Sequence, residues 1–551
     1  MKNKIFIIIF FPLLFITACE DQLDLLPPDK ISDATYWKDA EDFRMAANYL
    51  YNSLPFREYE LDADLMRGES VNSISAGTNL PVENDAYWNS RWESLRSINY
   101  LIEKAEMNST IDADRYKAEA RFFRALNYYL LVSRYGDVPL ITKALDNESD
   151  ELNSPRESRD IVIDFCIQDL QLAIPDLPLR SEMDASDLGR ITKGAAQTLL
   201  AKIALFEATW TKYNGGPGAS KVSDWLQIAI NASDAVINSD EYALYDLHGD
   251  DSYRQLFWNE DADDVNPGVK SEKVLSIIYI ENIKMNSASI SARDILSATK
   301  KAVDMYLCTD GLPIDKSPLF NGYGTYTSEF ENRDHRLIQS VAQEGDIIYD
   351  NHGARTLNPE VNYFITNYTG YKIKKFLADG AERHLYNVEY NDIEVFRYPE
   401  VLLIYAEAKY ENDGSISDAD LDRTINVLRT RGNIAPLTNV LVNENGLDML
   451  TEIRRERTVE LMFEGERLED LKRWGIAVQE MSQSFRGIQW DNSDWKDAGF
   501  GIETLTAHGT DAEGFIVKDP ASDRYFSEKH ILFPLPLQEL QITGWENNPG
   551  W

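Results

Sequence analysis

The sequence predicts a mainly α-helical protein with long irregular loops and minor β-structure. Several segments place apolar residues at the three- and four-residue spacing of a helix that buries one face. Between about 240 and 390 this periodicity fades, and Gly, Asn, Asp and Tyr become frequent, as is typical of loops. Because binding residues often lie on loops held by a rigid scaffold, we expect the helices to form the scaffold and the loops to carry function.

The clearest helices of the first half share an apolar stripe. Residues 113–134 carry such a stripe, and Gly136 follows as a stop signal. The pattern at residues 192–210 starts from Thr192, whose hydroxyl suits an N-cap. Residues 224–238 repeat the apolar pattern. These segments predict a run of amphipathic helices.

The second half contains three further helical patterns. Residues 399–411 begin with Pro399, which suits the first helical position. Residues 417–431 begin at Ser417, a candidate N-cap. Residues 448–474 are heavily charged around a thin apolar stripe, and the pattern predicts one long helix.

The N-terminus has the layout of a bacterial lipoprotein signal. Two lysines precede an apolar run at 5–15, and Ala18 and Cys19 follow it. We therefore expect residues 1–18 to be removed and Cys19 to carry the lipid that holds the mature chain on a membrane. The acidic pair after Cys19 resembles a surface-export signal. The alternative is a soluble secreted protein whose Cys19 lies inside an ordinary signal peptide.

Composition limits the ligands and the domain count. A formal charge of −37 on 551 residues argues against nucleic acid, and disfavours polyanionic ligands that meet no local basic patch. No Gly/Ser or Pro linker divides the chain, so we expect 19–551 to form a single domain. Cys166 and Cys308 could form a disulfide, but buried free thiols are the favoured interpretation.

The sequence contains no motif that indicates catalysis, a cofactor or a metal. The six histidines lack the spacing of a helical zinc site, and no phosphate loop is present. The acidic stretch Glu260–Asp264 lacks the Gly and the distal Glu of a calcium loop, so a solvated loop is favoured there. Glu460 and Glu464 share a helix face, as a glycosidase pair could. Nearby Arg457 and Arg467 favour ion pairing instead.

Five blocks of sequence carry a family resemblance. Tyr116–Thr142 reads YKAEARFFRALNYYLLVSRYGDVPLIT and ends in a Gly-Asp-x-Pro-Leu element. The other blocks, in order, are GRITKGAAQTLLAKIALF at 189–206, RYPEVLLIYAEA at 397–408, IRRERTVELMFEGERLEDLKRWG at 453–475 and WENNPGW at 545–551. Together they resemble the SusD/RagB family of outer-membrane nutrient-binding lipoproteins. The charged residues of these blocks are expected to form buried ion pairs between helices.

The resemblance implies a fold and a function. The fold is an α-α superhelix with four tetratricopeptide-like helix pairs, with an N-terminal half at about 20–240 and a C-terminal half at about 270–551. The implied function is to capture an oligosaccharide or polysaccharide at the cell surface and deliver it to a SusC-like TonB-dependent outer-membrane transporter. No enzymatic activity is implied.

Aromatic and amide side chains in loops are the candidate ligand contacts, because aromatic rings cover the flat faces of sugars. The resemblance directs attention to the loop before an early helix, within Ala76–Trp92, and to Phe320–Tyr326. The candidate residues are Tyr87, Trp88, Asn89, Tyr323 and Tyr326, with Trp490 and Trp495 as a further option. Core packing or loop anchoring is the alternative role for each aromatic residue.

Three other functions stay open on the sequence. The first is peptide uptake by a RagB-like protein with the same fold. The second is a surface glycoside hydrolase, and the third is a scaffold that binds only proteins.

Overall fold

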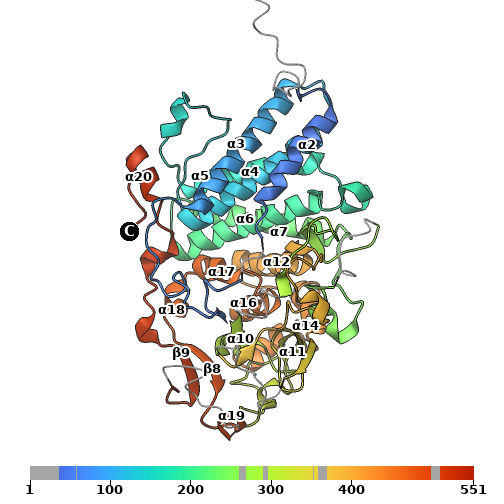
Figure 1. Ribbon diagram of the computed structural model, residues 1–551, viewed down its shortest axis with the longest axis vertical. Coiled ribbons are helices and arrows are strands. Elements are labelled where there is room, and N and C mark those ends of the chain that lie inside the picture. The colour runs from blue at the N-terminus through green and yellow to red at the C-terminus, as the bar shows by residue number, and fades with distance from the viewer. Residues whose placement is uncertain are drawn as a thin grey trace, which may run out of the picture.

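The computed structural model describes residues 36–56, 59–259, 268–289, 296–350, 353–357, 369–497 and 509–551. The predicted signal, the lipidated Cys19 and the acidic stretch Glu260–Asp264 lie outside the described residues. Helices of the first half occupy the upper part of the molecule, and most of the second half lies below them, whereas α20 (Leu537–Thr543) and the C-terminus lie beside the upper helices (Figure 1).

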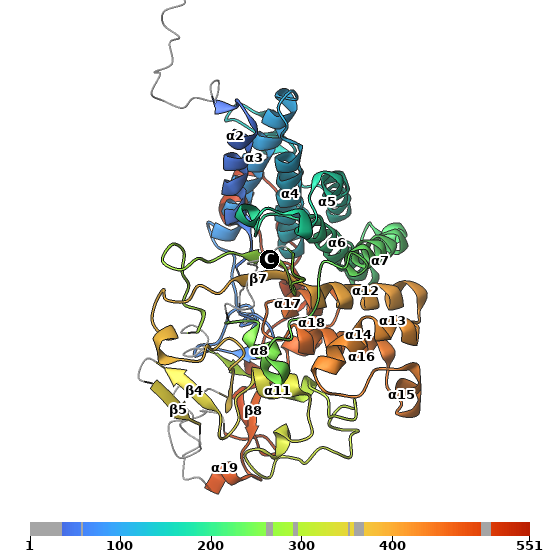
Figure 2. The ribbon, with the colours of Figure 1, turned by 90° about the vertical axis from the view of Figure 1, so that its right-hand side faces the viewer.

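Among the described residues, six α-helices form the upper part, and successive ones pack side by side (Figure 2). They are α2 (Ala40–Leu50), α3 (Ala86–Met107), α4 (Asp114–Tyr135), α5 (Arg159–Ala173), α6 (Lys193–Asn214) and α7 (Val222–Ile237). The three helices predicted in this region are therefore confirmed. The Thr192 hydroxyl accepts a hydrogen bond from the Ala195 N–H at 3.2 Å, as predicted for an N-cap. Gly136 ends α4 with a positive φ of 76°.

Helix α6 lies at the centre of this arrangement. It packs against α5 and α7, and also against two helices of the second half, α12 (Tyr398–Asp413) and α17 (Arg467–Arg473). Apolar residues therefore surround most of its circumference, which is the pattern of a buried helix. The buried side chains of α6 belong to the largest apolar core, which also contains Phe122, Phe123 and Trp225.

The second half is built from shorter helices around α12. They are α8 (Ser252–Gln255), α10 (Lys300–Met305), α11 (His335–Ser340), α13 (Asp418–Asp422), α14 (Ile425–Arg431), α15 (Asn439–Glu444), α16 (Met449–Glu460), α18 (Ala477–Met481), α19 (Asp494–Asp497) and α20 (Leu537–Thr543). The segment 417–431 thus forms two helices rather than one, because Thr424 leaves the helical conformation with φ −129° and ψ −89°.

The prediction of one long helix over 448–474 is wrong, because the chain turns between α16 and α17. Phe463 and Gly465 adopt positive φ values of 70° and 91°, which no α-helix contains. The Glu60 carboxylate accepts hydrogen bonds from four backbone N–H groups at this turn, at 3.0 to 3.2 Å. A carboxylate from the other end of the chain therefore satisfies N–H groups that a continuous helix would have paired internally.

Short antiparallel strands join the loops and confirm the minor β-structure. Strands β1 (Met66–Arg67), β3 (Ser297–Ala298) and β6 (Tyr371–Lys372) form one sheet in the order β1-β3-β6. Three two-stranded ladders pair β2 (Lys273–Ile277) with β7 (Ile393–Arg397), β4 (Ile347–Asp350) with β5 (Gly353–Thr356), and β8 (Phe485–Gln489) with β9 (Phe515–Asp519). The β1-β3-β6 sheet and the β4–β5 and β8–β9 ladders contribute to a second apolar core, which includes Tyr306, Phe376 and Trp495, whereas β2 and β7 pack into the first core.

The mainly α fold is therefore confirmed. Cys166 and Cys308 are both free and buried, as favoured by the sequence. Among the described residues, no helix has the length and apolar character that a membrane crossing requires.

Candidate functional site

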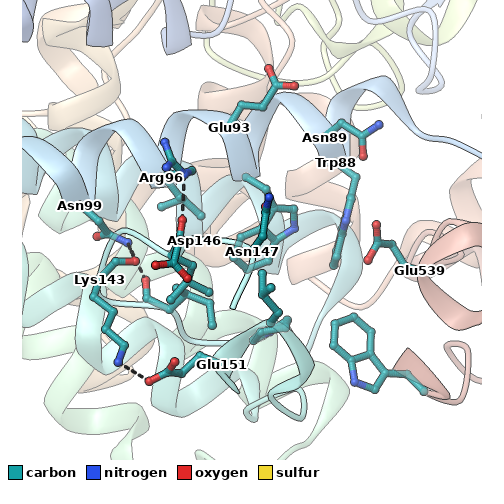
Figure 3. A pocket seen from close by; sticks show the side chains of 17 residues that line it. Trp88, Asn89, Glu93, Arg96, Asn99, Lys143, Asp146, Asn147, Glu151 and Glu539 are labelled. Carbon is teal, nitrogen blue, oxygen red and sulfur yellow. Dashed lines mark hydrogen bonds and ion pairs between the residues drawn. The ribbon is translucent and has the colours of Figure 1, made fainter. Parts of the chain in front are cut away.

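A cavity of about 450 Å³ opens between three segments that are far apart in the sequence (Figure 3). One wall is the face of α3 that carries Trp88, Asn89, Trp92 and Arg96. The second wall is the stretch 139–152 after α4, here called the loop wall. The third wall is the C-terminal segment, through Glu539 of α20 and Trp545. We treat this cavity as the candidate site because it combines aromatic rings with polar side chains in a concave surface.

The α3 wall follows from helical spacing. Trp88 and Trp92 are four residues apart, so both rings lie on the same side of the helix. The helix begins at Asp85, whose side chain accepts the Tyr87 N–H at 2.9 Å and the Tyr135 hydroxyl at 2.6 Å. This cap fixes the first turn of α3 against the end of α4, and thereby fixes the position of Trp88.

Trp88 forms the floor of the cavity rather than an exposed platform. Its ring meets Tyr135 edge-to-face with centroids 5.0 Å apart and lies 5.5 Å from the Trp92 ring. The residue is only 2% exposed. Most of its surface therefore belongs to the core, and a small part lines the cavity.

Hydrogen bonds from α3 and α4 hold the loop wall in place. The Asn99 amide donates to the Ile141 carbonyl at 3.0 Å, and the Tyr128 hydroxyl pairs with the backbone of Ile141 at 2.7 Å. The Glu103 carboxylate accepts the Ala144 N–H at 2.8 Å. The loop wall is thus fixed before any ligand arrives, which reduces the entropy lost on binding.

Four polar side chains of the cavity are available to a ligand. Asn89, Glu93, Asn147 and Glu539 have no side-chain hydrogen bond or ion pair with any part of the chain that the structure describes. The Glu539 carboxyl group is turned toward the Trp88 ring (Figure 3), and burial raises its pKa above the ordinary value. Amide and carboxylate groups beside aromatic rings can hydrogen-bond the hydroxyls of a sugar while the rings cover its C–H faces.

The predicted residues Trp88 and Asn89 line this cavity, whereas Tyr87 faces a different one. Tyr87 lines a neighbouring cavity of about 180 Å³, where the Arg134 guanidinium lies 4.3 Å from its ring. Trp92, the last residue of the region singled out in the sequence, is partly buried and also lines the larger cavity.

Tyr323 and Tyr326 lie in another part of the molecule. The Lys300 ammonium donates to the Tyr323 hydroxyl at 3.1 Å, and the Tyr323 ring packs edge-on against Phe515 of β9. Tyr326 donates to the Asp494 carbonyl at 2.9 Å and packs against Trp495 of α19. Helix α19 lies at the lower end of the molecule and α3 in its upper part (Figures 1 and 2), so these tyrosines do not join the cavity.

Trp490 and Trp495 contribute to the second core. They are 5% and 4% exposed, so their rings offer little surface to a ligand.

Glu539, Trp545 and Asn147 were not identified from the sequence. Trp545 lies in the last family block, to whose aromatic residues the sequence analysis assigned no role. The polar run after Thr142 was a weak signal for a surface loop. Nothing in the sequence indicates that residues more than 400 positions from α3 complete the cavity.

Ion pairing at Glu460 and Glu464 is confirmed, although the partners differ from those expected. Glu460 pairs with Arg336 and Arg397 at 2.7 and 2.6 Å, and also with Arg431. Burial raises the pKa of Glu460, but the three guanidinium groups outweigh that effect and hold it well below its usual range. A carboxylate fixed in this way is a poor proton donor or base.

The two expected partners pair elsewhere. Arg457 pairs with Asp470 at 2.8 Å, and Arg467 pairs with Asp64 at 2.8 Å. Among the described residues, no group of three or more metal-ligating side chains could hold a metal ion.

Two family profiles match the chain. The profile described as the SusD family matches residues 278–551, and one described as starch-binding, associating with the outer membrane, matches residues 30–205. A SusD-like protein of Formosa agariphila is 26% identical over 90% of this chain and 95% of its own. A SusD-like protein of Bacteroides ovatus is 25% identical over 89% of this chain and 86% of its own.

Solved structures share the fold. A SusD-like carbohydrate binding protein from Bacteroides fragilis superposes with a TM-score of 0.73 at 21% identity, covering 92% of this chain and 99% of its own. A laminarin binding SusD-like protein superposes with a TM-score of 0.60 at 19% identity, covering 94% and 100%. The chain belongs to the SusD/RagB family, whose members bind carbohydrate and are associated with the outer membrane.

Proposed function

We propose that this protein captures an oligosaccharide or polysaccharide in the cavity between α3, the loop wall and Trp545, and delivers it to a SusC-like TonB-dependent transporter. The observation that carries the proposal is the combination of three tryptophans with four polar side chains that have no partner among the described residues. Asn89, Glu93 and Asn147 are exposed and Glu539 is half-buried, so all four can exchange bound water for the hydroxyl groups of a sugar.

The geometry suggests how a sugar would be held. Trp545 is partly buried, so part of its ring is free to cover a sugar face, while Trp88 closes the floor. Asn89 can donate and accept, and Glu539 accepts from hydroxyl groups. Because the loop wall is already fixed by Asn99, Tyr128 and Glu103, the binding energy is not spent on ordering it.

Attachment and delivery complete the proposal. A lipid on Cys19 would hold the mature chain at the outer membrane, facing outward, and the resemblance to SusD-like lipoproteins supports a position beside a TonB-dependent transporter. Replacing Cys19 by Ser should move the protein from the membrane fraction to the soluble fraction. Co-purification of the tagged wild-type protein with a TonB-dependent barrel, from cells grown on the bound glycan, would support delivery.

Affinity electrophoresis tests the binding proposal. The lipid-free mature chain, residues 20–551, keeps every residue whose contacts are described above. It would migrate through gels that contain laminarin, pullulan, xylan, galactan, mannan, alginate, polygalacturonate or carrageenan. Laminarin is included because a structural relative binds it. We expect retardation by at least one glycan.

Two variants locate the binding. Trp545→Ala should lose the retardation, whereas Tyr386→Ala, which removes a ring that is 79% exposed and does not line the cavity, should keep it. Retardation by no glycan, together with binding of a peptide library, would replace this proposal by peptide uptake. Release of product from a retarding glycan would indicate a hydrolase.

A further inference from the structure

The charges of the cavity are not balanced. Four carboxylates and two cations line it. Lys143 forms an ion pair with Glu151 across the loop wall. Arg96 lies at the rim, where its Nε donates to the Leu145 carbonyl at 2.9 Å, and its charge acts on Asp146. Both cations therefore contact the loop wall, and the remaining carboxylates, Glu93 and Glu539, form no ion pair with any residue that the structure describes.

Glu539 is the one of these two carboxylates that faces the interior of the cavity. Glu93 is exposed and points away from the loop wall, whereas Glu539 is turned toward Trp88 (Figure 3). Glu539 is partly buried, and burial raises its pKa because no neighbouring cation offsets the lost hydration. Its two oxygens can accept hydrogen bonds but, when ionised, cannot donate any.

A ligand that approaches this cavity meets a negative electrostatic potential, which arises from the charge of the chain and is concentrated by the walls of the cleft. The whole chain carries a formal charge of −37, and the low-dielectric walls of a cleft concentrate the local field. A carboxylate or sulfate on a sugar would then face Glu539 without a counter-ion. A neutral hydroxyl, in contrast, donates directly to Glu539. The same residue thus attracts one class of glycan and repels another.

Resting on the proposed function, we infer that the cavity accepts neutral glycan segments and rejects segments that carry carboxylate or sulfate groups. Glu539 is the specificity-determining residue of this selection.

The test compares two variants that change the net charge by the same amount at adjacent positions of α20. Glu539→Gln removes the carboxylate from the cavity and keeps its shape. Gln538→Lys adds one positive charge on an exposed side chain that does not line the cavity. Any difference between the two variants therefore reports the position of the charge rather than its amount.

The measurement is affinity electrophoresis of the mature chain in the glycan panel given above. It is followed by calorimetric titration with the neutral hexose-based glycan that retards the chain most and with the same glycan oxidised to the carboxylate at its primary hydroxyls. We expect the wild type to bind the oxidised form at least tenfold more weakly. Glu539→Gln should reduce that ratio to about threefold or less, while Gln538→Lys should leave it within twofold of the wild type.

Two results would overturn the inference. Retardation of the wild type by alginate, polygalacturonate or carrageenan, in preference to every neutral glycan, would contradict the selection itself. An equal change of the ratio in both variants would show that net charge, and not Glu539, sets it. Retardation by no glycan at all would instead remove the proposed function, and this inference with it.

Discussion

The polar side chains of the ion-pair cluster around Glu460 are paired within the protein, whereas several of those in the cavity beside α3 are not. In the cluster, Glu460 is fully buried and contacts three guanidinium groups, and Arg397 further pairs with Glu272 at 2.9 Å. In the cavity, Asn89, Asn147 and Glu539 have no side-chain partner within the described chain. The cluster is complete without a ligand, whereas the cavity presents free donors and acceptors beside aromatic rings.

The difference has a physical cause. A buried charge without a partner is strongly destabilising, so charges in the dry interior must be paired within the protein. A polar group at a water-filled cavity keeps its hydration until a ligand replaces the water. Charged residues of the family blocks therefore stabilise the fold, and the less conspicuous polar residues of the cavity are the better candidates for binding.

The largest expected effect comes from breaking the cluster. Glu460→Ala removes a buried ion-pair partner from each of Arg336, Arg397 and Arg431, and we expect it to lower the free energy of unfolding by about 3–5 kcal/mol. Chemical denaturation measures this change. The control is Glu513→Ala, which removes an exposed partner of Arg486 and should change stability by less than about 1 kcal/mol. Equal effects of the two variants would contradict the contrast drawn above.

The second effect concerns Glu329, a buried residue that makes the stability of the fold depend on pH. Burial raises the pKa of Glu329 to about 7, while the Tyr371 hydroxyl donates to its carboxyl group at 3.0 Å. Between pH 4.5 and 7 the unfolded chain releases this proton and the folded chain keeps it, so Glu329 makes stability fall as the pH rises.

Glu329→Gln should remove that contribution. As the pH rises from 4.5 to 7.5, the free energy of unfolding of the variant should increase relative to that of the wild type by on the order of 2–3 kcal/mol. One pKa unit corresponds to about 1.4 kcal/mol. Denaturation midpoints at several pH values give the comparison, with the exposed Glu331→Gln as the control. Parallel pH profiles for the wild type and Glu329→Gln would contradict this account of Glu329.

The third effect separates the aromatic residues that line the cavity from the tyrosines predicted within Phe320–Tyr326. Trp545→Ala should weaken glycan binding about tenfold or more, which corresponds to about 1.4 kcal/mol, because it removes a sugar-facing ring. Tyr326→Ala should lower stability and leave affinity within twofold, because its hydroxyl and ring are used by Asp494 and Trp495. The reverse result, with folding intact, would place the site at the lower end of the molecule.

The smallest effect tests the fixed loop wall. Glu103→Ala leaves the Ala144 N–H without its acceptor and should cost about 0.5–1.5 kcal/mol of stability. We expect a two- to threefold loss of affinity, measured by calorimetry, because the loop wall then has to be ordered on binding. The control is Glu106→Ala, an exposed residue of the same helix that does not line the cavity, which should leave the affinity unchanged.

Helical periodicity predicted the scaffold well, because each amphipathic stripe follows from local spacing. It failed between α16 and α17, where the turn depends on a carboxylate contributed by Glu60. The cavity was predicted in part: Trp88 and Asn89 follow from the start of α3, a local feature. Glu539 and Trp545 could not be predicted, because only the tertiary fold brings the end of the chain to α3.

A crystal structure with an oligosaccharide of the retarding glycan tests the central claim most directly. The account predicts a sugar ring in the cavity between α3, the loop wall and Trp545, with hydroxyls within 3.2 Å of Glu539 or Asn89. A sugar bound beside Tyr323 and Tyr326, with the cavity left to water, would contradict it.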